Sequence, residues 1–430
     1  MRKVIVFVIF ASLFLLVGLA ASAGSEAKEI LTWQNCIQEA SKNNPDLVVA
    51  GEAVYQSQAL KAITTSGVFP QLTANASAGE TKTTPDFQKT TTLDSYSYGV
   101  TGSLLIFDGF KSSNNIKSAV QNIVAAQEAY RFSSADVRLQ LRIAFVDLLK
   151  AQELVRVTQD IAKIREDELK LISLRYKAGL EHKGALLATQ ASMTQAKFDL
   201  EQAVRNLDLA QRQLNKEMGR KEVAPFEINE KLTVQETFHQ KPNFQAIAND
   251  HPSVKQALAK RNSAGFSLKA DRGSYYPQIS LQAGANKDGH QWPPEDRGLN
   301  AQLVVSVPFF EGGLRKAQLS QAASVLRQAE AQLRSIEDST VLNLEQAWES
   351  FREAVEAVES AKESLAADEE RSRIAEAQYS TGFITYDNWT IIEDNIVQSK
   401  KAYLNAQANA LLAEAQWIKA KGETLEYASQ

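Results

Sequence analysis

Residues 71–79 read QLTANASAG, in which apolar side chains at even positions alternate with polar side chains at odd positions. A period of two indicates a β-strand with one apolar and one polar face. Three more segments alternate in the same way. Each run has about 9–11 residues, the length that a tilted strand needs to cross the hydrocarbon of a bilayer. We predict four strands, at about 69–79, 96–107, 276–286 and 299–310.

Aromatic residues gather at the ends of these strands, as they do at the two interfaces of a membrane. They are Phe69, Phe107, Tyr275, Tyr276, Phe309 and Phe310 at one end, and Tyr96 and Trp292 near the other. The segments between paired strands, 80–95 and 287–298, are polar and suit loops in water. In isolation the alternation also fits a soluble sandwich. In lipid, however, four strands cannot close a barrel and an open edge is not tolerated, so several chains must share one barrel.

The chain repeats itself at an offset of about 203–207 positions. The recurring motifs are Asn44-Pro45 with His251-Pro252, Phe107-Asp108-Gly109 with Phe310-Glu311-Gly312, and Tyr176 to Gly179 with Tyr379 to Gly382. We place repeat 1 at 24–219 and repeat 2 at 247–422. A connecting segment at 220–246 joins them, and a C-terminal tail follows at 423–430.

The N-terminus reads as a targeting signal. Arg2 and Lys3 precede an apolar run at 4–20 and small residues at 21–23, which is typical of a cleavable secretory signal peptide. We therefore expect residues 1–23 to be removed; a membrane anchor is the alternative. The formal net charge of −4 does not favour a nucleic-acid partner. The single cysteine and four scattered histidines predict no disulfide, metal site or cofactor.

Beyond Gly109 a helical pattern runs without proline for about 65 residues, or about 100 Å. Its seam residues recur at alternating three- and four-residue steps, as in a coiled coil. They are Leu141, Ala144, Leu148, Ala151, Val155, Thr158, Ala162, Arg165, Leu169, Ile172 and Tyr176. Repeat 2 has the same seam, with Asp368 in place of Arg165. We predict that these two charges make polar contacts with flanking helices; the alternative is that water solvates them.

Shorter helices are expected on either side of each long one. They run from about Asp46 to Gly67 and Lys183 to Met218, and in repeat 2 from about Ser253 to Gly273 and Tyr386 to Lys421. Together the two short helices of a repeat are about as long as its long helix. Stacked end to end, they could therefore run alongside it.

With these residues identified, the chain resembles the TolC-type outer-membrane efflux proteins. The resemblance rests on the order of the motifs in duplicate and covers about 30–220 and 245–423. It implies a mainly α fold with a transmembrane β part: a homotrimer pools four strands per chain into a twelve-stranded β-barrel in the cell outer membrane. A long α-helical barrel continues it through the periplasm. The implied function is passive exit, in efflux or type I secretion, of substrates from an inner-membrane pump (RND or ABC type) through a periplasmic adaptor.

The resemblance also implies where partners dock and where the channel closes. The adaptor-docking tip turns map to Tyr176, Gly179, Leu180, Tyr379, Gly382 and Phe383. The gate, or pore mouth, maps to Asp387, Asn388, Ile391, Glu393 and Asp394. Asn388 and Ile391 replace two aspartates that ring the constriction in the best-known member. An acidic ring from the three carboxylates is one hypothesis, and an ordinary solvated helix face is the other.

A different class of function stays open at this stage. A periplasmic coiled-coil adaptor or scaffold also has long alanine-rich hairpins, but it has no use for four strands of membrane length. An enzyme is disfavoured, because acidic pairs such as Glu369-Glu370 lie in helices without a histidine, serine or glycine-rich partner nearby.

Overall fold

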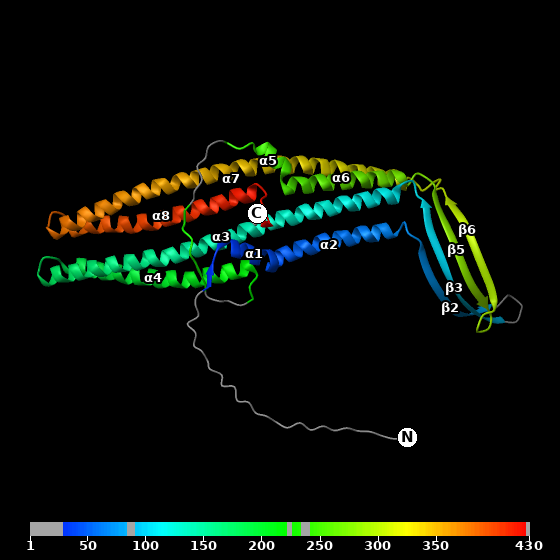
Figure 1. Cartoon of the computed structure of the whole chain (residues 1–430), viewed down its shortest axis with the longest axis horizontal. Coiled ribbons are helices and arrows are strands. Elements are labelled where there is room, and N and C mark those ends of the chain that lie inside the picture. Colours follow the sequence, from blue (N-terminus) through cyan, green and yellow to red (C-terminus); the bar gives the residue numbers. More distant parts are fainter. Residues whose placement is uncertain (1–28, 84–90, 222–225, 234–240, 427–430) are drawn as a thin grey trace, which may run out of the picture.

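The computed structural model describes residues 29–83, 91–221, 226–233 and 241–426. The predicted signal peptide at 1–23 therefore lies outside the described residues, as do parts of the predicted connecting segment and tail. The molecule is elongated, with a β-sheet at one end and two helical turns at the other (Figure 1). We call these the sheet end and the turn end.

Two long helices form the frame. Helix α3 (Lys111–Lys177) and helix α7 (Leu314–Ser380) have 67 residues each. Helices α2 (Pro45–Ser66) and α4 (Lys183–Met218) lie end to end beside α3, and α6 (Pro252–Gly273) and α8 (Tyr386–Ala420) lie beside α7 (Figure 1). This confirms the predicted stacking. None of the helices in the described part of the chain combines the length and apolar character that crossing a bilayer requires.

The repeated Asn-Pro and His-Pro motifs mark the junctions between stacked helices. The Asn44 side chain accepts hydrogen bonds from the backbone N–H groups of Asp46 and Leu47, so it caps α2. Its own amide donates to the carbonyl oxygen of Glu217 at the end of α4, at 2.9 Å. His251 caps α6 in the same way by accepting from the N–H of Ser253. A side-chain cap thus satisfies helix-end groups that would otherwise be unpaired where two helices meet.

The predicted seam is confirmed as the packing face of both long helices. Its members in repeat 1 are buried or half-buried except Tyr176, and all of its members in repeat 2 are buried or half-buried. Leu141, Ala144, Leu148, Leu344 and Phe351 are almost completely buried.

The four predicted strands form one antiparallel sheet. It is ordered β2 (Gln71–Thr83), β3 (Thr91–Phe107), β5 (Gln278–Gly289) and β6 (Asp296–Ser306). In the described part of the chain, the outer edges of β2 and β6 have no partner strand.

Some strand boundaries differ from the prediction. The strands extend into segments 80–95 and 287–298, which we expected to be loops, because cross-strand pairing continues to Thr83–Thr91 and to Asp288–Asp296. The last strand ends at Ser306 rather than near 310. Pro308 follows two residues later and has no N–H to donate to a ladder.

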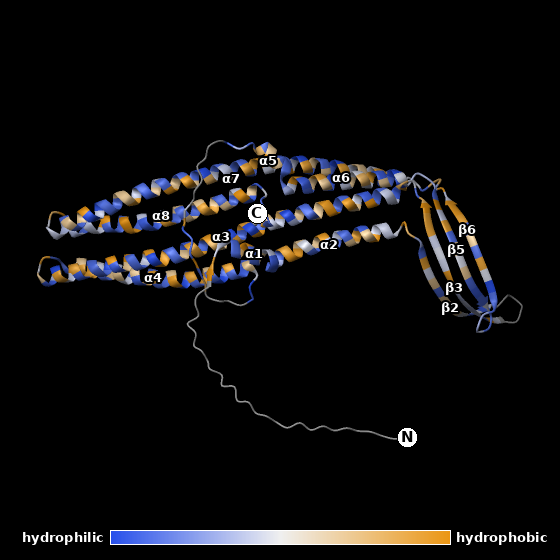
Figure 2. Ribbon diagram, in the orientation of Figure 1, coloured by the Kyte–Doolittle hydropathy of each residue, from blue (hydrophilic) through white to orange (hydrophobic). Residues whose placement is uncertain are grey.

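The register gives the sheet one apolar and one polar face. Ala74, Val100, Ala285 and Leu299 are cross-strand partners and therefore share a face. Even positions of β2 and β3 thus share a face with odd positions of β5 and β6, which we call the apolar face. Figure 2 shows that apolar and polar residues share every strand.

The middle of the molecule contains elements that the sequence did not predict. Strand β1 (Glu29–Leu31) pairs in parallel with β4 (Phe226–Ile228). Helix α1 (Trp33–Asn43) packs on α3 and α4, and helix α5 (Phe244–Asp250) packs on α6 and α7 on the other side of the molecule (Figure 1). The predicted connecting segment is therefore partly structured. The start of the predicted tail also packs, since Leu425 is completely buried and Arg138 pairs with Glu423 at 3.2 Å. Both segments help to cover the main core, which includes Phe145 and Phe226.

Gly109 links the sheet to α3 in a conformation that favours glycine. Its φ is 68°, and an added Cβ would lie 2.3 Å from the carbonyl oxygen of Gly273. We expect Gly109→Ala to destabilise the protein by more than about 2 kcal/mol, because the left-handed backbone and the clash both oppose a side chain. The control Gly265→Ala, where the nearest atom is 4.0 Å away in a helix, should change stability by no more than about 1 kcal/mol. Thermal unfolding in detergent measures both, and equal midpoints for the two variants would contradict this account.

Candidate functional site: the turn end

The two turns at this end each need a glycine. Gly179 follows α3 with φ 72°, and Gly382 follows α7 with φ 83°, and an added Cβ would meet no atom within 4 Å at either. The turns therefore need glycine for its backbone freedom rather than for space. Large apolar side chains follow directly: Leu180 is 67% exposed and Phe383 is 83% exposed. Exposed apolar residues at such a tip are suited to contact a partner.

The two tyrosines of the repeated Tyr-x-x-Gly motif have different environments. Tyr176 is 39% exposed, whereas Tyr379 is 1% exposed. Tyr379 stacks on Trp389 with ring centroids 4.5 Å apart and planes at 4°. The Tyr379 hydroxyl donates to Glu181 at 2.6 Å. Tyr379 was predicted as a docking residue, but its side chain is buried in the internal packing and offers a partner almost no surface.

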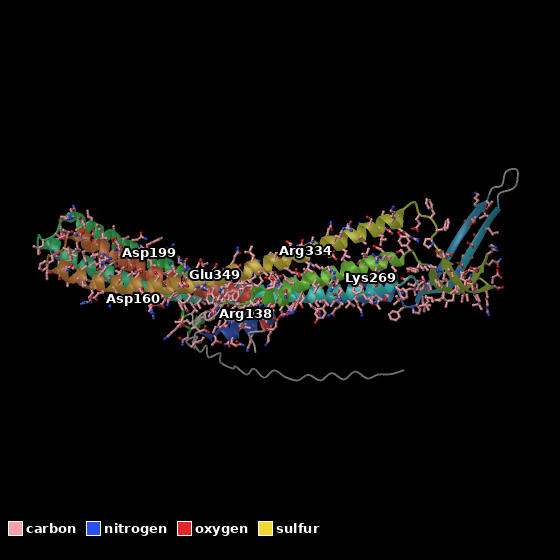
Figure 3. All side chains as sticks on the ribbon, turned by 90° about the horizontal axis from the view of Figure 1, so that it is seen from above. Arg138, Asp160, Asp199, Lys269, Arg334 and Glu349 are labelled. Carbon is pink, nitrogen blue, oxygen red and sulfur yellow. The ribbon has the colours of Figure 1, made fainter. Side chains whose placement is uncertain are left out.

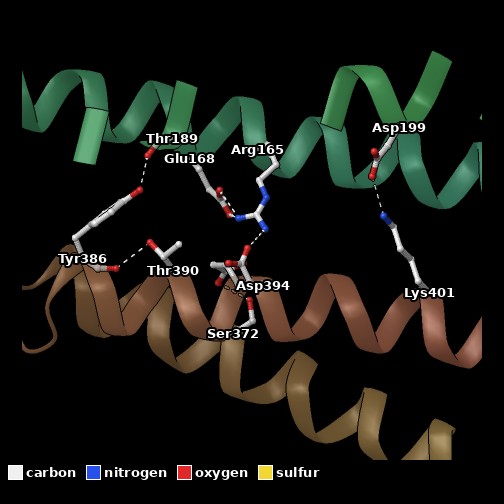
Figure 4. A network of polar contacts seen from close by, with 10 residues as sticks. Arg165, Glu168, Thr189, Asp199, Ser372, Tyr386, Thr390, Asp394 and Lys401 are labelled. Carbon is white, nitrogen blue, oxygen red and sulfur yellow. Dashed lines mark hydrogen bonds and ion pairs between the residues drawn. The ribbon is translucent and has the colours of Figure 1, made fainter. Parts of the chain in front are cut away.

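Tyr379 belongs to a cluster that joins the two helical hairpins, α3/α4 and α7/α8. The Arg175 guanidinium lies 4.6 Å from the centre of the Tyr379 ring. Tyr386 shares a hydrogen bond of 2.9 Å with Thr189 across the same gap (Figure 4). Aromatic stacking, a cation over a ring and hydrogen bonds thus hold the hairpins together near the turns. We call this set, with Glu181 and Trp389, the aromatic clamp.

Farther from the turns, a buried arginine makes a second connection. Arg165 is 5% exposed and donates to Glu168 on its own helix at 2.9 Å. It also bonds to Asp394 on α8 (Figure 4). Its repeat counterpart Asp368 accepts a hydrogen bond from Ser399, also on α8. The predicted polar contacts of Arg165 and Asp368 with flanking helices are therefore confirmed.

The predicted pore-mouth residues do not form one group. Glu393 is 5% exposed and accepts a hydrogen bond from Ser372 at 2.8 Å, so it lies inside the helical packing. Asp394 is partly exposed but paired with Arg165. Asp387, Asn388 and Ile391 are exposed on α8. An acidic ring that includes Glu393 is therefore not supported, since its carboxylate points into the packing.

Burial governs the electrostatics of this connection. Burial raises the pKa of Glu168 to about 7, although Arg165 acts in the opposite direction. Burial also raises the pKa of Glu393. For Arg165, burial opposes the charge, but Glu168 and Asp394 together raise its pKa. The guanidinium therefore stays charged while its carboxylate partner Glu168 titrates near neutral pH.

A third connection lies nearer the middle of the molecule. Lys401 of α8 pairs with Asp199 of α4 at 2.8 Å, and this bond and Gln195 lower the pKa of Asp199 despite partial burial (Figure 4). Sequence reasoning did not identify Arg175, Glu181, Trp389 or this pair. The partners of Arg175, Glu181 and Lys401 lie about 200 positions away in the chain, so no local pattern could have revealed these contacts. Trp389 stacks on a residue of its own repeat. Within the described residues, no group of three or more histidine, cysteine or acidic side chains could hold a metal ion.

Comparisons with known proteins agree with this architecture. A family model described as outer membrane efflux protein matches residues 36–220 and 244–423. The outer membrane efflux protein BepC of Brucella suis biovar 1 is 26% identical over 367 residues, covering 83% of this chain and 77% of the relative. Protein CyaE of Bordetella pertussis is 21% identical over 256 residues, covering 58% of this chain and 54% of that protein.

Solved structures have the same fold. A crystal structure of CusC gives a TM-score of 0.83 at 18% identity, covering 90% of this chain and 91% of that one. The open state of the Neisseria gonorrhoeae MtrE outer membrane channel gives 0.80 at 19% identity, covering 92% and 90%. At such identities the likeness concerns the fold.

The raised pKa of Glu168 predicts a pH dependence at the turn end. At a pH between 4.5, the ordinary pKa of glutamate, and about 7, Glu168 keeps its proton in the packed state and loses it in the opened state. The stability of the packed turn end should therefore fall as the pH rises through this window. Glu168→Gln resembles the protonated form and should remove this slope. It should gain at most about 3 kcal/mol over the natural protein at pH 8 and little at pH 4.

Hydrogen exchange of the turn-end amides, corrected for the intrinsic rate at each pH, measures this difference. The charged and titratable groups facing Glu168 are Arg165, Glu393 and Asp394, so Asp199→Asn near Lys401 serves as a control at a separate ion pair. A slope that survives Glu168→Gln would show that another group titrates.

Proposed function

The chain belongs to the outer membrane efflux protein family, whose members are channels of the outer membrane, and from that premise we propose that three copies form one continuous duct. Substrates leave passively through it after an inner-membrane pump, of the RND or the ABC type, delivers them through a periplasmic adaptor. A periplasmic scaffold, the alternative from the sequence, would have no use for the four-stranded sheet.

The sheet carries this proposal. Among the described residues of one chain, the outer edges of β2 and β6 have no partner strand, and lipid offers their backbone groups no partner either. If β6 of one chain pairs with β2 of the next, three copies of four strands close without an edge. The apolar face would then meet lipid, and the polar face would line a water-filled lumen. The helices leave the sheet at one end, so they would extend the duct into the periplasm.

The turn end would be the periplasmic tip. Leu180 and Phe383 are its exposed apolar residues, so we assign adaptor docking to them and to the turns around Gly179 and Gly382. The aromatic clamp and the Arg165–Asp394 pair bind the two hairpins of each chain to each other. Opening would then be a two-state change at this end that the adaptor biases through contacts made only in the open state.

If three copies form one duct, the purified protein should be trimeric and should conduct ions. The purified protein should run as a species of three chains that heat converts to one, and it should conduct in planar bilayers. Asp288 and Asp296 are cross-strand partners on the polar face near the strand ends remote from the helices. They would place two carboxylates per chain in the lumen and favour cations there.

The variant Asp288→Asn/Asp296→Asn should move the reversal potential in a salt gradient toward zero. Glu80→Gln/Asp94→Asn is a matched control, because these two residues are also cross-strand partners but lie on the apolar face. If the control lowers cation selectivity and the first variant does not, the two faces are assigned the wrong way round. If the protein is monomeric without detergent, no duct exists.

The docking surface predicts a separable loss of transport. Leu180→Glu/Phe383→Glu places charge on the exposed apolar tips and should weaken adaptor binding by more than about tenfold, with trimers intact. Ser320→Glu/Gln321→Glu adds the same charge at exposed positions of α7 near the sheet end and should have no effect. Cross-linking to the adaptor and efflux in the native host measure both variants. Unchanged efflux in the tip variant would mean that the adaptor docks elsewhere.

A further inference from the structure

Two cations interrupt the apolar face of the sheet where its apolar residues end. Lys287 of β5 and Arg297 of β6 are direct cross-strand partners, and Tyr98 of β3 is the partner of Lys287 on the other side. The three side chains therefore form one row across three strands. Neither cation makes an ion pair or a side-chain hydrogen bond with another residue that the structure describes.

The row lies at the depth of lipid headgroups. From Ile279 to Lys287 the strand rises about 27 Å, and a tilt of about 45° reduces this to about 19 Å of membrane depth. On this face of β5, the residues that precede Lys287 are all apolar: Ile279, Leu281, Ala283 and Ala285. An apolar band of an outer-membrane sheet is about 25 Å tall. Lys287 and Arg297 are the first charged residues after this apolar run, at the end remote from the helices, and their long side chains can extend the remaining few ångströms to the headgroups.

Aromatic rings border the two cations. Trp292 is 67% exposed, and its ring lies 6.1 Å from that of Tyr98 and 6.2 Å from that of Tyr96. Tryptophan and tyrosine favour the headgroup region, where an apolar ring and a polar atom can both be satisfied. Their flat faces also suit the CH-rich faces of sugar rings. The site therefore offers positive charge beside a surface for carbohydrate.

The protein itself does not compensate this charge. Like charges at paired positions of a sheet repel each other. The neighbouring carboxylates Asp288 and Asp296 lie on the opposite face. On the same face, Glu80 and Asp94 of β2 and β3 lie beyond the row that contains Tyr98, and Glu295, just before β6, makes no ion pair with Arg297 among the described residues. An anion from the membrane would relieve the repulsion between Lys287 and Arg297.

We propose that Lys287 and Arg297 bind a phosphate of the phosphorylated glycolipid in the outer leaflet, with Tyr98 and Trp292 against its sugars. Arginine can bind a phosphate through two parallel N–H groups, and lysine adds a mobile point charge. Each chain carries one such site. The inference rests on the proposed function only for the orientation of the sheet, with its apolar face in lipid and its hairpins outward.

Native mass spectrometry of purified trimers tests this site. The probes are the diphosphorylated glycolipid anchor, its monophosphorylated form, and phosphatidylglycerol, which is anionic but lacks the sugar backbone. The natural protein should retain the diphosphorylated lipid best. Lys287→Gln/Arg297→Gln should bind it about tenfold more weakly, because two headgroup-level cations are lost. Lys269→Gln/Arg334→Gln removes the same charge from α6 and α7, outside the sheet (Figure 3), and should bind it like the natural protein.

Two results would overturn the site. One is equal retention of the diphosphorylated lipid by the Lys287/Arg297 variant. The other is equal affinity of the natural protein for all three lipids, which needs no variant and would indicate generic attraction to anionic lipid. Trimers and conductance are measured on the same samples. If these are intact while lipid selectivity is absent, the site is wrong and the duct stands; if the natural protein forms no trimers, the duct fails and the site with it.

Discussion

The unpaired edges of the sheet determine most of what this chain must do. A backbone N–H or carbonyl in hydrocarbon has no water to bond with, so edge strands must find partners before they enter a membrane. One chain supplies four strands, of 11 to 17 residues, whose two faces differ in polarity. Such a sheet is stable in lipid only when other copies complete it.

The repeat is close in architecture but not in chemistry. Arg165 and Asp368 occupy equivalent seam positions with opposite charge, and both reach α8. Tyr176 and Tyr379 occupy equivalent turns, yet one is partly exposed and the other is stacked inside the aromatic clamp. Duplication therefore sets the fold, whereas later divergence between the copies sets how the hairpins hold one another.

The sequence predicted those features that repeat locally. Alternation at 71–79, the repeated Asn44-Pro45 and His251-Pro252 motifs and the seam of α3 each depend on residues close together in the chain, so they are visible in the sequence. The middle elements were not predicted, because β1 pairs with β4 about 200 positions later and each strand has only three residues. The contacts of Arg175 and Glu181 in the aromatic clamp were not predicted for the same reason, because Tyr379 is about 200 positions away from both. Tyr379 contacts Glu181 and Arg175 from the other repeat, and no pattern within one repeat reveals those contacts. Its stacking partner Trp389 lies in its own repeat, where repeat 1 has Leu186 at the equivalent position.

This divergence makes the contacts at the turn end unequal. Within one chain, Arg175 and Glu181 hold Tyr379, and Asp394 holds Arg165. At the repeat offset, the counterparts of Arg175 and Glu181 are Gln378 and Ile384, so the second hairpin cannot offer Tyr176 the same charged partners. The counterpart of Asp394 is Ala191, which cannot bind a guanidinium. In a ring of three chains, the interface between the two hairpins of one chain would therefore make different contacts from the interface between neighbouring chains. The interface between the two hairpins of one chain carries the ion pair of the buried Arg165 with Asp394 and the contacts of Arg175 and Glu181 with Tyr379. A conformational change that spares these contacts must therefore use the interfaces between chains.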